Sequence, residues 1–208
     1  MLEKIYIIHY KYLEDRKIYL DEKLRDIKVP YEFIINDKQS DSINLENVNK
    51  YYIHDSNIHE RHLTKGEICL SISHFDVYKK ILEDNNINKN ILIIEDDALF
   101  SDDLLERVSE IINELTDDYD MCFISECCNL HANKIDGKII YPSKTSRCVT
   151  GYIVNKKCLR KILETLPFQY PIDWHLNYIN EKLNLKYFWS EPCVIVQGSE
   201  SVYKSNLR

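Results

Sequence analysis

The chain has 208 residues, enough for one sizeable hydrophobic core. Its formal net charge of −7 and pI of about 5.5 argue against general binding to nucleic acid. No apolar run reaches the roughly 18–20 residues needed to span a bilayer, and residues 1–16 lack the apolar segment and cleavage site of a signal peptide. We therefore expect a cytoplasmic protein with neither an integral membrane segment nor a nucleic-acid partner, and we leave its oligomeric state open.

The cysteines are scattered and form no CxxC pair. There are seven of them, at Cys69, Cys122, Cys127, Cys128, Cys148, Cys158 and Cys193. Most lie in apolar stretches, where cysteine acts as a small core residue. We expect reduced thiols, as in a cytosolic protein, rather than a structural zinc site or a disulfide framework.

The N-terminal part of the chain predicts a β-α-β unit. Lys4 to Tyr10 is a β-rich run, a charged helical stretch covers 14–25, and a second strand covers 29–35. This order is the usual beginning of a nucleotide-binding sheet. The polar segment 36–61 then indicates a long surface loop with short helical turns.

The segment 64–82 has the periodicity of an amphipathic helix. Thr64 suits the N-cap, and Glu67 completes a capping-box pattern. Ile68, Ile72, Phe75 and the pair Tyr78/Lys79 recur at helical spacing, so we expect one face to pack on a sheet.

The remaining segments alternate between strands and helices. We expect strands at 91–97, 120–125, 138–141, 149–154 and within 186–196, and helices at 102–115, 156–166 (capped by Asn155) and 174–183. This alternation predicts one α/β domain over residues 1–208. The chain has four glycines and no GxGxxG or P-loop pattern, which disfavours a dinucleotide site or a P-loop ATPase.

An apolar strand ends in three acids at Ile91 to Asp97, with the sequence ILIIEDD. In open α/β sheets ligands bind beyond the carboxyl ends of the strands, so Glu95, Asp96 and Asp97 fall where such a sheet does its chemistry. Adjacent carboxylates repel unless a positive group neutralises them, and their oxygens suit Mg²⁺ or Mn²⁺, which would bridge them to a diphosphate. The alternative is an ordinary acidic turn or helix start.

Several segments together resemble glycosyltransferase family 25. They read LTKGEICLSISH at 63–74, IIEDDALF at 93–100, TGYIVNKKCLRKIL at 150–163, PID at 171–173 and EPCVIVQGSES at 191–201. The family includes bacterial lipooligosaccharide galactosyltransferases and collagen β-galactosyltransferases. The resemblance implies a GT-A type, Rossmann-like single domain with a mostly parallel central sheet flanked by helices. It also implies a UDP-sugar donor (UDP-galactose or UDP-glucose), Mn²⁺ with Mg²⁺ as the alternative ion, inversion at the anomeric carbon, and an acceptor hydroxyl on a glycan or a hydroxylysine.

The resemblance gives the acidic triplet a division of roles. Asp97 matches the usual metal ligand, and Glu95 would approach the ribose, the metal or a metal-bound water. Strand alternation would turn Asp96 to the opposite side, whereas a turn would bring it back towards the sugar.

The resemblance also suggests donor contacts near the first strand. The end of this strand would hold the uracil through main-chain groups of Ile8, His9 and Tyr10. Arg16 matches an arginine of the family that could neutralise phosphate, and a solvent-exposed helical arginine is the alternative.

Further donor contacts would come from the helix that begins near Thr64. Lys65, Gly66 and Glu67 lie at its start, where amide dipoles favour an anion or an oxygen-rich group. Glu67 could instead serve only the capping box. His74 belongs to the family motif, although a hydrogen-bonded packing role is the alternative for a histidine at that position.

An inverting transfer needs a general base for the acceptor hydroxyl. Asp173, in the PID element, is the first candidate, and Glu126, just past the predicted strand 120–125, is the second. Asp173 could also be the N-cap of a helix that begins at Trp174. Trp174 or Tyr152 could stack on a sugar, although buried packing is common for both residue types.

The C-terminal segment departs from many GT-A enzymes, which place a further metal-binding His or Asp near the end of the chain. Here no histidine follows His175. Gln197 or Ser199 could contact the diphosphate instead, and water would complete the metal shell.

Two other functions compete with a glycosyltransferase. One is a non-catalytic domain that binds a nucleotide sugar or a glycan. The other is a metal-dependent phosphoesterase or nuclease, which should disperse acids and histidines over several strand ends, whereas this chain has one tight cluster.

Overall fold

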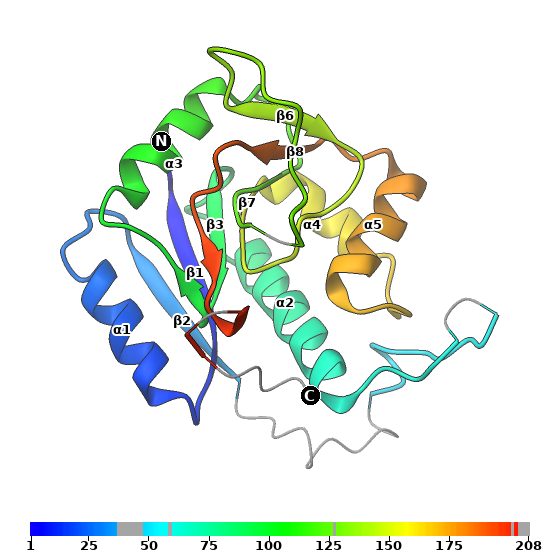
Figure 1. The fold of residues 1–208 in the computed structure, drawn as a ribbon. Coiled ribbons are helices and arrows are strands. Elements are labelled where there is room, and N and C mark those ends of the chain that lie inside the picture. The colour runs from blue at the N-terminus through cyan, green and yellow to red at the C-terminus, as the bar shows by residue number, and fades with distance from the viewer. Residues whose placement is uncertain (37–47, 58–59, 127, 201, 204–208) are drawn as a thin grey trace.

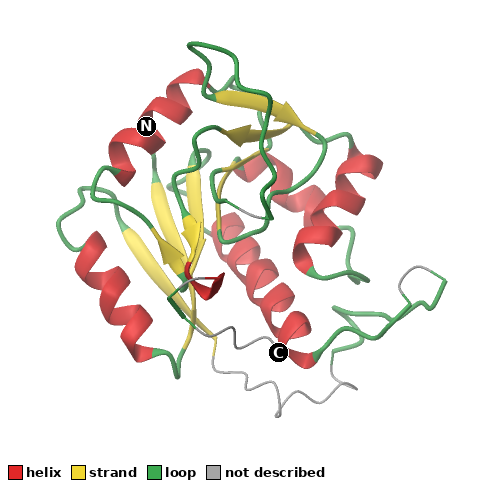
Figure 2. Ribbon diagram, viewed as in Figure 1, coloured by secondary structure: helices red, strands yellow, loops and turns green. Residues whose placement is uncertain are grey.

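The computed structural model describes residues 1–36, 48–57, 60–126, 128–200 and 202–203. Its centre is a seven-stranded sheet with strand order β2-β1-β3-β7-β5-β8-β6. Helices cover both faces of this sheet, which gives the molecule three layers (Figure 1, Figure 2). The predicted α/β class is confirmed.

The N-terminal β-α-β unit forms as predicted. It consists of β1 (Lys4–Tyr10), α1 (Glu14–Leu24) and β2 (Tyr31–Asn36). β1 pairs in parallel with β2 and, on its other edge, with β3 (Ile91–Glu95). Of the loop predicted at 36–61, residues 37–47 and 58–59 lie outside the described residues, and turns occur within 48–57.

The long helix α2 (Lys65–Glu83) begins at the predicted capping box. The Thr64 hydroxyl accepts from the Glu67 N–H, and the Glu67 carboxylate accepts from the Thr64 N–H at 2.7 Å. Ile68, Phe75 and Tyr78 are buried on the face that packs against the sheet. Both predictions for this helix are therefore confirmed.

The remaining elements follow the predicted alternation, with shifted boundaries. They are β4 (Ala98–Leu99), α3 (Leu104–Glu114), β5 (Met121–Phe123), β6 (Ile140–Ser143), β7 (Gly151–Val154), α4 (Lys156–Leu163), α5 (Ile172–Leu183), β8 (Tyr187–Ser190), β9 (Val196–Gln197) and a 3₁₀ turn (Gly198–Glu200). Asn155 caps α4 as predicted, because its side chain accepts from the Lys157 N–H at 3.2 Å. The predicted strand within 186–196 is in fact two short strands, and β9 leaves the main sheet to pair with β4.

The main sheet is mixed but mostly parallel. β2, β1, β3, β5 and β8 share one direction, whereas β7 and β6 run the opposite way. β3 therefore has a parallel neighbour on one edge and an antiparallel neighbour, β7, on the other. The mostly parallel sheet flanked by helices is confirmed.

Two hydrophobic clusters lie on the two faces of the sheet. Ile91 and Ile93 of β3 join the cluster with α2, α4 and α5, whereas Leu92 and Ile94 join the cluster with α1 and α3. Successive strand residues point to opposite faces, so a strand buried on both faces must be apolar throughout. This explains the unbroken aliphatic run before the acids.

The cysteines differ from the expectation in one respect. Cys69, Cys122 and Cys158 are buried free thiols, as expected for core residues. Cys148, however, is disulfide-bonded, so the expectation of reduced thiols is wrong for this residue. Cys127 lies outside the described residues.

Within the described ranges, none of the helices is both long enough and apolar enough to traverse a bilayer. The cytoplasmic location and the single domain over residues 1–208 stay predictions.

Candidate functional site

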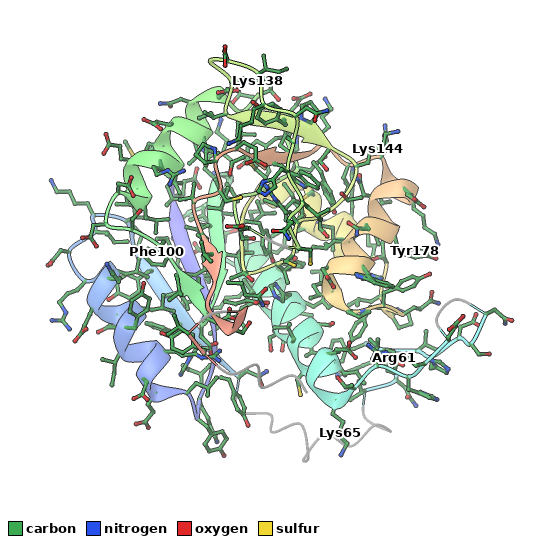
Figure 3. The ribbon with its side chains drawn as sticks, in the orientation of Figure 1. Arg61, Lys65, Phe100, Lys138, Lys144 and Tyr178 are labelled. Atoms are coloured by element: carbon green, nitrogen blue, oxygen red, sulfur yellow. The ribbon has the colours of Figure 1, made fainter. Side chains whose placement is uncertain are left out.

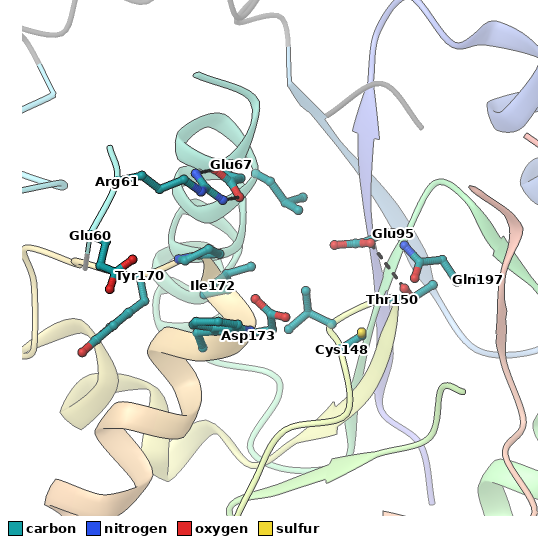
Figure 4. Close-up of a pocket in the computed structure, with 14 residues that line it drawn as sticks. Glu60, Arg61, Glu67, Glu95, Cys148, Thr150, Tyr170, Ile172, Asp173 and Gln197 are labelled. Atoms are coloured by element: carbon teal, nitrogen blue, oxygen red, sulfur yellow. Dashed lines mark hydrogen bonds and ion pairs between the residues drawn. The ribbon is translucent and has the colours of Figure 1, made fainter. Parts of the chain in front are cut away.

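A cavity of about 860 Å³ opens at the carboxyl end of β3. Its walls come from the first turns of α2 and α5, the segment before β7, and β9, and they include Glu67, Glu95, Thr150, Asp173, Trp174 and Gln197. Figure 4 shows the carboxylates of Glu95 and Asp173 projecting into this space from different walls. The cavity therefore gathers acids from segments far apart in the sequence.

Glu95 ends β3 and is buried. Its Oε1 lies 3.2 Å from His74 Nε2, and its Oε2 accepts from Thr150 Oγ1 at 3.5 Å. Burial, followed by the negative charges of Asp97, Asp96 and Asp173, raises the pKa of Glu95 well above its usual value. A cation near the end of β3 would stabilise the ionised form of this carboxylate.

Asp96 turns away from the cavity and faces β1 and α1. Its Oδ1 accepts from the Arg16 guanidinium at 2.8 Å, and its Oδ2 accepts from the Tyr10 N–H at 2.9 Å and lies 3.1 Å from His9 Nδ1. Arg16 is 8% exposed, so the alternative of a solvent-exposed helical arginine is wrong. The Asp96 carboxylate links the end of β1 to α1.

Arg16 also lines a second, smaller cavity of about 440 Å³, together with Lys11, Tyr12 and Tyr203. The Tyr203 ring lies 4.7 Å from the centre of the Arg16 guanidinium. This cavity lies just past the end of β1, where Ile8 and His9 are buried within the strand and Tyr10 is its last residue.

Asp97 lies beneath the C-terminal segment. Its main-chain oxygen accepts from the Gly198 N–H at 2.7 Å, and its Oδ2 accepts from the Ser199 N–H at 3.3 Å. Its Oδ1 is buried and has no hydrogen-bond partner among the residues that the structure describes. A Cβ on Gly198 would lie 2.6 Å from the Asp97 main-chain oxygen, so the close approach requires glycine.

The described residues fit a metal ion that is shared with a substrate, and among them no metal site is built by protein side chains alone. Nowhere in the described part of the chain do three or more His, Cys, Asp or Glu side chains gather to hold a metal. Mg²⁺ is commonly bound by one or two carboxylates, with phosphates and water as the remaining ligands. The partnerless Oδ1 of Asp97 is the observation that suits such an ion.

At the start of α2, both carboxylate oxygens of Glu67 accept hydrogen bonds from neighbouring residues. Arg61 donates to both of its carboxylate oxygens, at 2.8 and 2.6 Å, which makes the pair bidentate. This pairing lowers the pKa of Glu67 to about 2. Lys65 is exposed, points away from the molecule in Figure 3 and does not line the cavity, nor does Gly66.

His74 is completely buried and does not line the cavity. It reaches the cavity only through Glu95, and its Nδ1 lies 2.9 Å from Tyr152 Oη. Burial lowers the pKa of His74 to about 3, so the imidazole is neutral at ordinary pH.

Asp173 lies in the first turn of α5, whose N-cap is Pro171. The prediction that Asp173 is the N-cap is therefore wrong, because the helix begins at Ile172. Burial raises the pKa of the Asp173 carboxyl group, although backbone N–H groups of the first turn partly oppose this. The side chain lines the cavity, and Trp174 beside it is 58% exposed.

Glu126 lies elsewhere. Its N–H donates to the Ile195 carbonyl at 2.8 Å, and its side chain is not part of the cavity wall. Gln197, in contrast, lines the cavity next to Glu95, because β9 pairs Gln197 with Ala98.

Sequence reasoning missed several residues of the cavity wall, including Arg61, Cys148, Thr150 and Tyr170. Thr150 is the first residue of the TGYIV segment, and its place in a family-like motif could have identified it as a candidate site residue. Arg61 belongs to a polar loop, and no spacing rule connects it to Glu67.

Comparisons with curated proteins give two informative relatives. A mimivirus protein (Acanthamoeba polyphaga mimivirus) named procollagen lysyl hydroxylase and glycosyltransferase is 29% identical over 108 residues, which cover 49% of this chain and 12% of the relative. Procollagen galactosyltransferase 1-A of Xenopus laevis is 20% identical over 197 residues, which cover 86% of this chain and 31% of the relative. The chain thus spans less than a third of the length of these relatives.

A solved structure shares the fold. It is a glycosyltransferase involved in the glycosylation of the major capsid of PBCV-1, with a TM-score of 0.56, 9% sequence identity, and coverage of 95% of this chain and 94% of that chain. This likeness supports the GT-A fold.

A family model described as glycosyltransferase family 25 (LPS biosynthesis protein) matches residues 2–176. Since this match takes in most of the sequence, including the acidic strand end and every residue that lines the cavity except Gln197, the chain belongs to glycosyltransferase family 25.

Proposed function

We propose that the chain transfers a hexose, galactose or glucose, from a UDP-sugar to a hydroxyl group of a glycan or a hydroxylysine-type acceptor, with inversion at the anomeric carbon. The observation that carries the proposal is that Glu95 and Asp173 line one cavity at the carboxyl end of β3. Asp97, two residues after Glu95, does not line this cavity, but its buried Oδ1 has no hydrogen-bond partner among the described residues. Family membership and the galactosyltransferase named among the relatives agree with it.

Asp173 is the proposed general base. Its carboxylate lines the cavity, and its raised pKa makes it a better proton acceptor than an ordinary aspartate. It would take the proton of the acceptor hydroxyl as that oxygen attacks the anomeric carbon. Glu126 is the weaker candidate, because its side chain is not part of the cavity wall.

Asp97 and Glu95 are the proposed ligands of Mn²⁺ or Mg²⁺. When bound, such an ion supplies positive charge that offsets the charge of the departing diphosphate. Asp97 would contribute the oxygen that has no partner in the described part of the chain, while Ser199 holds the other oxygen through its N–H. Gln197 lines the cavity beside Glu95 and would offer its amide to the sugar or the diphosphate.

The smaller cavity past the end of β1 is the proposed site of the uridine. Tyr12 and Tyr203 offer aromatic surfaces there, and Arg16 offers a positive charge that is already anchored by Asp96. Its volume of about 440 Å³ suits a nucleoside rather than a whole nucleotide sugar.

The test is release of UDP from UDP-galactose and from UDP-glucose by the purified chain, with Mn²⁺ and a panel of glycan and hydroxylysine acceptors. We expect turnover that requires the metal, and Asp97→Asn should lower it about 100-fold or more, as removal of a charge-stabilising group does. The matched control is Asp117→Asn, because that side chain is 94% exposed and pairs only with Lys89 in the described structure.

Retained turnover in a folded Asp97→Asn protein would contradict the proposed role of Asp97. UDP binding seen by calorimetry, without turnover on any donor or acceptor, would instead support a non-catalytic binding domain.

A further inference from the structure

A buried hydrogen-bond chain leads from the core of the molecule to Glu95. Tyr78 Oη lies 2.8 Å from Tyr152 Oη, which lies 2.9 Å from His74 Nδ1, and His74 Nε2 lies 3.2 Å from Glu95 Oε1. Tyr78, Tyr152 and His74 each show no exposed surface. These hydrogen bonds connect three elements, since Tyr78 and His74 lie on α2, Tyr152 on β7 and Glu95 on β3.

The direction of these hydrogen bonds follows from counting hydrogens. If His74 Nδ1 carries a hydrogen, it donates to Tyr152, Tyr152 donates to Tyr78, and the Tyr78 hydroxyl hydrogen has no acceptor in the described structure. A buried donor without an acceptor is unfavourable. If Nδ1 carries none, Tyr78 donates to Tyr152, Tyr152 donates to Nδ1, and Nε2–H donates to Glu95. Every hydrogen then has an acceptor.

We propose that Tyr152, supported by Tyr78, is a positioning residue that fixes His74 as its Nε2–H tautomer and thereby orients Glu95 at the cavity. The link to catalysis rests on the proposed function, because it requires Glu95 to act on the donor. The direction of the hydrogen bonds does not depend on that function.

The orientation matters because Glu95 lies among like charges. Asp97, Asp96 and Asp173 all act on its carboxylate, and a glutamate side chain has several rotatable bonds with which to turn away from them. A fixed N–H donor at Oε1 holds one oxygen against α2 and leaves Oε2, which Thr150 contacts at 3.5 Å, at the cavity. The buried tyrosines thus prepare the geometry of the site before the donor binds.

The first experiment reads the tautomer directly by NMR of protein labelled with ¹⁵N-histidine, at neutral pH and without ligand. The His74 signals are assigned by their loss in His74→Gln. We expect a protonated Nε2 and an unprotonated Nδ1 in the wild type and in Tyr78→Phe, and loss of this single tautomer in Tyr152→Phe. A wild-type His74 with its proton on Nδ1 would overturn the proposal.

The second experiment measures kcat/KM for UDP-galactose with Mn²⁺. We expect Tyr152→Phe to lower it about 10-fold, the usual order for the loss of an outer contact to a site ligand. Tyr187→Phe is the matched control, because Tyr187 is equally buried and its hydroxyl donates only to the Leu176 carbonyl, at 3.2 Å, in the described structure. We expect little change in the control.

The outcomes separate the two proposals. An equal loss in Tyr152→Phe and Tyr187→Phe, at equal folding, would mean a merely structural role and would overturn the positioning proposal. Absence of turnover with every UDP-sugar in the wild type would overturn the proposed function, and the tautomer measurement would still decide the hydrogen-bond direction.

Discussion

Three consecutive acids at the end of β3 meet three different environments. Glu95 faces the cavity and His74, Asp96 faces Arg16 and the end of β1, and Asp97 lies under the C-terminal segment. Alternation along the strand separates Glu95 from Asp96, and the turn after β3 redirects Asp97. Since the three side chains have different partners, their substitution should have different consequences.

Asp96 is expected to be a structural residue. Asp96→Ala removes the partner of a buried arginine, so we expect a loss of about 3–5 kcal/mol in the free energy of unfolding, measured by urea titration. Asp102→Ala, which breaks the exposed pair with Lys23, is the control and should change stability little. Equal stability of the two variants would show that the Arg16–Asp96 pair does not hold α1 to the sheet.

Asp173 is expected to act in the chemical step. Asp173→Asn keeps the shape of the side chain but removes its basicity, so kcat should fall about 100-fold or more while UDP affinity, measured by calorimetry, stays similar. Glu126→Gln is the control, because Glu126 is not part of the cavity wall. If Glu126→Gln lost activity and Asp173→Asn kept it, the assignment of the base would be reversed.

At the scale of elements, the site depends on where α2, α5 and β9 begin. The first turns of the two helices bring Glu67 and Asp173 to the cavity, and the pairing of β9 with β4 brings Gln197 there. The same pairing places Gly198 against Asp97. Short elements with precise ends therefore determine the shape of the site.

The capping box fixes the start of α2. Thr64→Ala removes the hydroxyl that accepts from the Glu67 N–H, and we expect a loss of about 1 kcal/mol in the free energy of unfolding. Lys65→Ala, an exposed change to a good helix former in the first turn, should have almost no effect on the urea midpoint. A loss of the same size in both variants would show that the cap is not the cause.

At the scale of the whole molecule, two hydrophobic clusters lie on the two faces of the sheet, and the described interior also contains buried polar groups. His175 is one such group, packed among Phe75, Phe168 and Tyr178 in the layer of α2, α4 and α5. Arg147 is another, fully buried and paired with Glu191 at 2.6 Å. These groups make the stability of the core depend on charge.

Acid should destabilise the molecule partly through His175. Burial lowers the pKa of His175 from 6.5 to about 4, so between these values the unfolded chain binds more protons than the folded protein. The free energy of unfolding should therefore fall as the pH falls from about 6.5 towards 4. Urea midpoints measured across this range should show a shallower fall for His175→Gln than for the wild type.

The comparison has a control, and a second buried histidine is expected to contribute to the same pH dependence. His62→Gln, at an exposed position, should leave the slope unchanged. His74, whose pKa burial lowers to about 3, should preserve part of the slope in His175→Gln. An unchanged slope in His175→Gln would exclude His175 as a source of the acid sensitivity.

Local patterns in the sequence were enough for the α/β class, the β-α-β opening and the capping box of α2. These features depend on neighbours within a few positions, such as Thr64 with Glu67 or the aliphatic run before Glu95, so residue order alone determines them. The family resemblance added the fold type and the candidate acids.

Only the tertiary structure decided which acids share a cavity, which acids form ion pairs within the protein, and which residues line the cavity. Asp173 and Glu95 are far apart in the sequence, Arg16 is paired with Asp96, and Arg61 with Glu67. His74 looked like a candidate donor contact and proved to be buried behind Glu95. Such partnerships depend on how distant segments pack, and periodicity or spacing along the chain does not specify which distant side chains meet.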